Sequence, residues 1–174
     1  MNPVLVRWHA LPRDEAALEV LSCCGSRSWA AQLAAMRPFA DEPNLFAAAD
    51  RCWQRLPEAD WLEAFRSHPR IGEKHAQSKT TAASAAWSSA EQSQMKAADA
   101  AILLRMQQGH RQYEERFGRI FIVCASGKQP AEMLQILEGR LSNDPAEELL
   151  ESAAQQQQIM QLRLRKWLAG PGVA

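Results

Sequence analysis

The sequence predicts an all-α domain with one extended segment, on three observations. Apolar residues recur at helical spacing over most of the 174-residue chain. Glycine, proline and capping residues fall where these periodic stretches end. The one run typical of a buried strand, residues 120–125 (IFIVCA), has no second strand of similar quality with which to pair. We therefore expect this segment to pass through a helical core, with its backbone polar groups bonded outside any sheet.

Four helices are expected before residue 70, each bounded by a cap, a glycine or a proline. They cover residues 14–24, 29–37, 43–56 and 58–66, with Ser28 as the cap of the second. The fourth must end near Ser67-His68-Pro69, because a residue that precedes a proline is pushed out of the helical region.

Beyond residue 70 the periodicity stops and then returns. Residues 70–87 have no sustained period and predict a functional or mobile loop. A long helix is expected from Ser88 to Phe117, with Gly109 inside it as a point of weakness. Two more helices are expected over residues 130–141 and 145–168, the last one capped by Asp144. We expect a single domain over residues 1–174, with a loose tail at 169–174.

The composition argues against several classes of protein. Lys plus Arg number 20 and Asp plus Glu number 20, and this zero net charge is not typical of proteins that bind nucleic acid or anionic membranes. The four cysteines have neither a disulfide pattern nor zinc-site spacing, which favours buried thiols in a reducing compartment. The sequence shows no signal peptide or membrane span. We expect a cytoplasmic protein.

Three side chains are candidates for chemistry. His68 lies at a helix end before Pro69, and histidine exchanges protons near neutral pH; the alternative is that it only bonds the last carbonyls of its helix. Glu91 lies in the stretch SSAEQ at 88–92, which can equally be a capping box at a helix start. Arg163 lies at the edge of an apolar stripe, and its alternative is a surface arginine along the helix.

Other chemistries have less support. His68 and His75 lack the i, i+4 spacing of a helical zinc pair, and no acidic cluster accompanies them. Cys124 could be a nucleophile with His68 as its base, but nothing in the sequence orients the two side chains. The sequence contains no glycine-rich phosphate-binding motif and no serine-hydrolase motif. We therefore expect no bound metal ion.

Five sequence blocks occur in one order along the chain: FRSHPRIGE, WSSAEQ, YEERFGRIFIVCASG, RLSND and LRLRKWL. Together with the earlier CCGSRSWAAQLAAMRPF, they resemble the 2-oxo-4-hydroxy-4-carboxy-5-ureidoimidazoline (OHCU) decarboxylase family over residues 18–168. The resemblance implies a single all-α domain, usually a homodimer. It also implies a small-molecule reaction, the last step from urate to (S)-allantoin, in which CO2 is lost and a proton is then transferred stereospecifically.

The resemblance assigns roles to particular residues. The catalytic histidine, glutamate and arginine of the family fall on His68, Glu91 and Arg163. Its substrate contacts fall on Pro69, on Ser88, Ser89, Ala90, Glu91 and Gln92, and on backbone groups of Ile120, Phe121, Ile122, Val123 and Cys124. Three features depart from the family pattern: Arg119-Ile120 replaces the Phe-Pro of FGFPF, His110 replaces a common asparagine, and residues 73–87 are not strongly family-like.

A cofactor-free mechanism fits this implied reaction. The carboxylate of the substrate lies next to a C=N bond that can accept the electrons left by CO2, so the protein has to orient the substrate and supply a proton. The hypothesis gives His68 the proton transfer, Glu91 the ureido or ring N–H groups, and Arg163 the ring carbonyl oxygens. Two rivals are a non-catalytic helical interaction module and a hydrolase of a related ureide, which would need a metal or a nucleophile.

Overall fold

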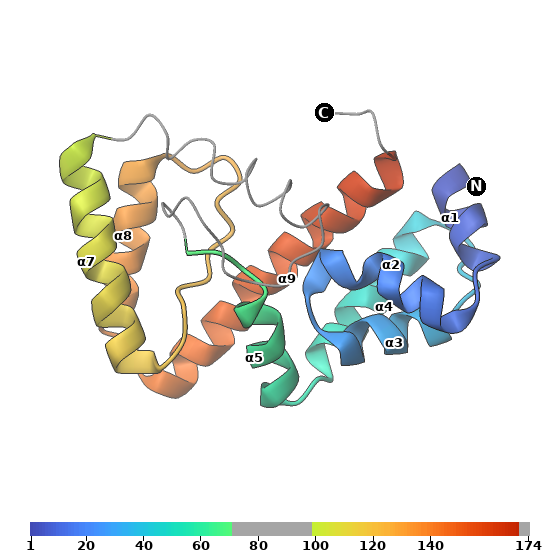
Figure 1. Cartoon of the computed structure of the whole chain (residues 1–174), viewed down its shortest axis with the longest axis horizontal. Coiled ribbons are helices and arrows are strands. Elements are labelled where there is room, and N and C mark those ends of the chain that lie inside the picture. Colours follow the sequence, from blue (N-terminus) through green and yellow to red (C-terminus); the bar gives the residue numbers. More distant parts are fainter. Residues whose placement is uncertain (71–98, 171–174) are drawn as a thin grey trace. The chain divides into compact units, whose positions relative to one another are not determined.

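A computed structural model describes residues 1–70 and 99–170, and within these ranges the chain forms eight α-helices and no β-strand (Figure 1). The all-α prediction is confirmed. The helices are α1 (Pro3–His9), α2 (Arg13–Cys24), α3 (Arg27–Ala35), α4 (Glu42–Gln54), α5 (Glu58–Arg66), α7 (Ala100–Phe117), α8 (Pro130–Arg140) and α9 (Pro145–Ala169). No helix in the described ranges has the length and apolarity to cross a membrane.

The chain divides into two compact units. The first consists of Met1–Ala64 with Gln157–Ala174, and the second consists of Phe65–Gln156. The division falls inside α5 and inside α9, so each of these helices contributes residues to both units.

Local signals place most helix ends correctly. Gly25 ends α2 in the left-handed conformation, with φ of 86°, which glycine adopts without the strain that a Cβ would cause. Helix α5 covers the predicted residues 58–66. Helix α9 begins at Pro145, and the Asp144 carboxylate accepts a hydrogen bond of 2.9 Å from the N–H of Ala146.

Three boundaries differ from the predictions. Ser26, and not Ser28, caps α3, because its hydroxyl accepts the N–H of Trp29 at 3.2 Å. Helix α1, which the periodicity does not reveal, begins with a cap at Asn2. A continuous helix from residue 88 to 117 is wrong, because Asp99 has a non-helical ψ of 144° and caps α7. Residues 71–98, which include the expected loop, and the tail from 171 lie outside the described residues.

The first unit is built around buried tryptophans. Trp8 meets Trp167 edge to face, with 5.4 Å between ring centroids. The indole N–H of Trp8 donates to the carbonyl of Ala16 at 2.9 Å, and that of Trp29 donates to Ala49 at 3.0 Å. Trp8 and Trp29 therefore bury their apolar surface without losing their hydrogen bonds, which makes them core residues.

In the second unit, α7 and α8 lie side by side, and the non-helical segment after α7 runs back to the start of α8 (Figure 1). This segment contains residues 120–125, which form no strand and no helix, as predicted. Side chains of the two helices and of the segment share one apolar cluster, made of Met106, Tyr113, Phe121, Val123, Ala125, Met133, Leu134 and Leu137.

Gly109 allows the close approach of α7 and α8. A Cβ at this position would lie 2.8 Å from Cδ2 and 3.2 Å from Cγ of Leu137. Gly109→Ala should therefore lower the free energy of unfolding by about 1 kcal/mol, because overpacking costs about 1–3 kcal/mol and alanine's helix propensity returns about 1 kcal/mol.

The matched control is Gly139→Ala in α8, where an added Cβ meets nothing within 4 Å. That variant should gain about 0.4–1 kcal/mol. Urea denaturation of the two variants and the wild type checks both signs. A Gly109→Ala variant as stable as Gly139→Ala would contradict the packing argument.

Candidate active site

His68 lies at the chain bend that follows α5. Its backbone N–H donates to the carbonyl of Phe65 at 3.1 Å, which closes the last turn of the helix. The residue is half-buried, and Pro69 after it keeps the backbone out of the helical region. His68 and Pro69 thus belong to the second unit, and His68 lies two residues beyond the last residue of α5.

The extended segment has two unlike backbone edges. The N–H and C=O of one residue in an extended chain point to the same side, and neighbouring residues point to opposite sides. Ile122 and Cys124 therefore share one edge. Cys124 donates its N–H to Gln155 Oε1 at 2.9 Å, and Ile122 O accepts from Arg140 Nη1 at 2.8 Å. Lys128 Nζ donates to Cys124 O at 2.8 Å. Side chains thus bond three polar groups of this edge, Cys124 N–H, Cys124 O and Ile122 O, in place of a neighbouring strand.

The other edge is available for a ligand. Phe121 and Val123 are 2% and 4% exposed, yet their N–H groups make no hydrogen bond with another described residue. The N–H groups of Ile120 and Ile122 are likewise without a described partner, although by the alternation they lie on the first edge; the edge of Phe121 and Val123 has no bonded amide at either residue. Buried amides normally find a partner, so this edge suits a polar planar ligand. Cys124 differs from these residues, because its N–H already donates a hydrogen bond to Gln155.

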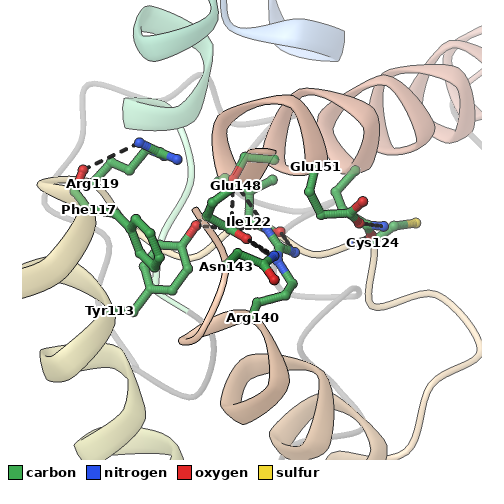
Figure 2. Close-up of polar contacts among 11 residues, drawn as sticks. Tyr113, Phe117, Arg119, Ile122, Cys124, Arg140, Asn143, Glu148 and Glu151 are labelled. Carbon is green, nitrogen blue, oxygen red and sulfur yellow. Dashed lines mark hydrogen bonds and ion pairs between the residues drawn. The ribbon is translucent and has the colours of Figure 1, made fainter. Parts of the chain in front are cut away.

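A buried polar network holds the bonded edge in place (Figure 2). The Arg140 guanidinium donates to the Glu148 carboxylate through Nη2 at 2.5 Å and Nε at 3.0 Å. The Tyr113 hydroxyl and Asn143 Nδ2 also donate to Glu148. Arg140 lies over the Phe121 ring at 4.7 Å, so one cation contacts both the backbone and a side chain of the segment.

This network was not among the predicted site residues. A signal for it exists in the sequence, because Arg140 follows Met133 and Leu137 on the apolar stripe of α8. A cation at that spacing has to be buried or extend out of the stripe, and only the partners decide which. The structure buries it: the side chains of Arg140 and Glu148 are 8% and 0% exposed.

The network predicts a pH dependence of stability. Burial raises the pKa of Glu148, but the hydrogen bonds from Arg140 and Tyr113 outweigh burial and hold that pKa below its usual value. The stability that ionised Glu148 contributes should therefore be lost as the pH falls through this depressed pKa. Burial and the bond to Glu148 raise the pKa of Tyr113 to about 12. The stability that the neutral Tyr113 hydroxyl contributes is full below the usual pKa of about 10 and is lost between about pH 10 and 12.

The measurement is simple because Tyr113 is the chain's single tyrosine. Its ultraviolet absorbance should report tyrosinate formation near pH 12, and urea denaturation should show the alkaline loss of stability. Tyr113→Phe should abolish that alkaline loss. A tyrosine that titrates near its usual pKa in folded protein would contradict the buried bond.

Arg163 is fully buried in the first unit, so the alternative prediction of a surface arginine along the helix is wrong. Its Nη1 donates to the carbonyl of Ser22 at 3.4 Å, near the end of α2. Burial raises the pKa of the neighbouring Cys23 thiol, although the charge of Arg163 opposes the rise. Cys23, Cys24, Cys52 and Cys124 are all buried and none of the four forms a disulfide bond, which confirms the prediction of buried thiols.

The structure thus places the predicted residues in two groups. His68, Pro69 and residues 120–124 belong to the second unit, whereas Arg163 belongs to the first. Ser88, Ser89, Ala90, Glu91 and Gln92 lie outside the described residues. Among residues 1–70 and 99–170, no three histidine, cysteine or acidic side chains are grouped so as to hold a metal ion.

Comparison with known proteins places the chain in a family. The family model of OHCU decarboxylase matches residues 9–165. This chain belongs to the OHCU decarboxylase family. The blocks that carry the resemblance in sequence lie within the matched residues, except that the final LRLRKWL, residues 162–168, extends three residues beyond them.

Relatives of known sequence and structure agree with membership of the OHCU decarboxylase family. The chain is 34% identical over 137 residues to an OHCU decarboxylase of Amia calva, which is 78% of this chain and 77% of that protein. It is 34% identical over 144 residues to the uric acid degradation bifunctional protein TTL of Arabidopsis thaliana, and the match spans 83% of this chain but only 44% of that protein.

Solved structures support the fold. An OHCU decarboxylase crystallised in the presence of (S)-allantoin matches with a TM-score of 0.74 and 33% identity, over 87% of this chain and 97% of that one. An (S)-allantoin synthase matches with a TM-score of 0.67 and 18% identity, over 94% of this chain and 53% of that one, and this shows likeness of fold alone.

Proposed function

We propose that this chain catalyses the cofactor-independent decarboxylation of OHCU to (S)-allantoin in urate catabolism. The observation that carries the proposal is the segment at residues 120–123, whose backbone N–H groups have no hydrogen-bond partner among the described residues. This segment lies in a chain that belongs to the OHCU decarboxylase family. A ureidoimidazoline is a planar ring with carbonyl oxygens, which are the acceptors that these amides need.

The reaction needs little from the protein beyond orientation and a proton. The bond from the ring carbon to the carboxylate breaks, and its electron pair passes into the adjacent C=N bond as CO2 leaves. The nitrogen of that bond takes up a proton. The hydroxyl of the ring carbon then gives up its proton and becomes a carbonyl, while a proton is added from one face to the neighbouring ring carbon, which carries the ureido group, and this gives the S product. We assign this proton transfer to His68, because an imidazole can both donate and accept a proton near neutral pH.

The remaining assignments complete the proposed site. Glu91 binds the ureido or ring N–H groups and sets the charge of the imidazole, and Arg163 holds ring carbonyl oxygens. Pro69 and residues 88–92 supply further contacts with the substrate. The active protein is proposed to be a cytoplasmic homodimer that acts on a small molecule without a nucleic acid or membrane partner.

Circular dichroism can test the proposal directly. Urate is oxidised enzymatically in the cuvette, and its unstable product is hydrolysed to OHCU before this protein is added. The expected result is faster appearance of optically active (S)-allantoin than in the uncatalysed reaction. A non-catalytic interaction module would leave the rate unchanged, and a ureide hydrolase would consume allantoin instead.

A further inference from the structure

Arg119 carries two buried hydrogen-bond donors that no described residue satisfies. Its Nε and Nη2 atoms are buried and have no hydrogen-bond partner in the described ranges. The third nitrogen, Nη1, donates only to the carbonyl of Phe117 at 3.4 Å, and the guanidinium carbon lies 5.5 Å from the centre of the Phe117 ring (Figure 2). A buried guanidinium edge without a partner is costly, so such an edge indicates a ligand.

The two open nitrogens define the kind of ligand. The N–H bonds of Nε and Nη2 point in the same direction along one edge of the planar guanidinium. This is the edge that forms two parallel hydrogen bonds to the two oxygens of a carboxylate. A carbonyl group offers a single oxygen, and a cation or an apolar group offers no acceptor. The open edge therefore suits a carboxylate anion.

Arg119 lies close in the sequence to the proposed substrate site. Arg119 lies two residues before Phe121, whose open amide begins the free edge of the extended segment. Two residues of extended chain span about 7 Å, which is comparable to the size of a ureidoimidazoline. One small molecule can therefore contact the open amides through its ring and the guanidinium through a carboxylate.

We propose that Arg119 forms the carboxylate subsite of this enzyme and binds the group that leaves as CO2. The inference rests on the proposed function and adds a residue at which this chain departs from the FGFPF pattern. The pair forms in the ground state and persists in the transition state while the carboxylate still carries charge, whereas the product, which has lost the carboxylate, makes no such pair. The residue should therefore favour substrate binding and product release, with little effect on the chemical step.

The test separates substrate binding from product binding. Arg119→Gln should raise the KM for OHCU by about 10- to 100-fold, the usual cost of losing hydrogen bonds to a charged group. Its kcat and its affinity for (S)-allantoin should stay within about 3-fold of the wild type. Allantoate, a stable ureide with a carboxylate, should raise the melting temperature of the wild type but not of the variant. Arg119→Lys should have a KM between those of the wild type and Arg119→Gln, because an ammonium supplies the charge without the two parallel hydrogen bonds.

Arg116→Gln is the matched control. Arg116 also lies over the Phe117 ring, at 5.3 Å, but it is exposed and its Nη2 bonds the carbonyl of Asn143 at 3.0 Å. This variant should keep the wild-type KM.

Because Arg119→Gln removes an unpaired buried charge, it should melt at the wild-type temperature or above.

The possible failures are distinct. A wild type that does not accelerate OHCU decay overturns the proposed function. An active wild type whose KM is unchanged in Arg119→Gln overturns the carboxylate subsite alone. An equal loss of affinity for OHCU and (S)-allantoin also overturns it, because Arg119 would then contact the ring.

Discussion

His68→Asn should reduce the turnover of OHCU by roughly 10²- to 10⁴-fold, the usual range for a lost general acid or base. The amide resembles the imidazole in shape but cannot exchange a proton near neutral pH. The backbone at this position is set by the N–H bond to Phe65 and by Pro69, so the fold should not change. The assay is the in situ formation of (S)-allantoin, with a melting curve for each variant.

His9→Asn is the matched control, because His9 is also a histidine at a helix end, as the last residue of α1. Its Nε2 accepts the N–H of Phe39 at 3.2 Å, which is a structural role. This variant should keep turnover even if it melts slightly lower. If His68→Asn melts like the wild type and makes (S)-allantoin at a similar rate, His68 is only a helix-end residue and the proposed mechanism is wrong.

The partner of His68 in the proposal can be tested by the same assay. Glu91→Gln should also slow the reaction, and the His68→Asn/Glu91→Gln double variant should lose less than the sum of the single losses. Residues that act in one step are not additive, because removing either one already disables that step. Strict additivity would separate the roles of the two side chains.

Arg140→Met should lower the free energy of unfolding by about 3–5 kcal/mol, which is the cost of leaving one member of a buried ion pair without its partner. Glu148 would remain fully buried without the guanidinium that binds both its oxygens. The same change removes the donor to Ile122 O and the cation over Phe121, so the extended segment should lose its fixed position. The remaining activity per folded molecule should therefore fall as well.

Arg105→Met provides the comparison with an exposed pair. Arg105 Nη2 donates to Glu138 at 2.6 and 2.8 Å, but the two side chains are 59% and 40% exposed. Such a pair is worth at most about 1 kcal/mol, since water and salt screen it. Chemical denaturation of both variants measures the difference. Equal losses would mean that Arg140 and Glu148 exchange with solvent and do not hold the segment.

The helices of this chain were predictable because their signals are local. Gly25 ends α2, Asp144 with Pro145 starts α9, and the proline after His68 ends α5, each through contacts within a few residues. The same local reasoning fails for α7. Periodic apolar residues continue on both sides of Asp99, yet its side chain caps a new helix there. Periodicity alone does not show such an interruption, because a capping residue can also lie on the polar face of a longer helix.

The candidate site required more than local information. The sequence motifs and their order point to the OHCU decarboxylase family and to His68, and the missing second strand predicts that residues 120–125 have no sheet. The sequence does not show that Arg140 and Glu148 pair across eight residues, that Cys124 bonds Gln155, or that two nitrogens of Arg119 are buried without a described partner. Hydrophobic periodicity specifies which face of a helix is buried. The partner of a buried charge, by contrast, depends on where distant segments meet, and only the packed structure decides that.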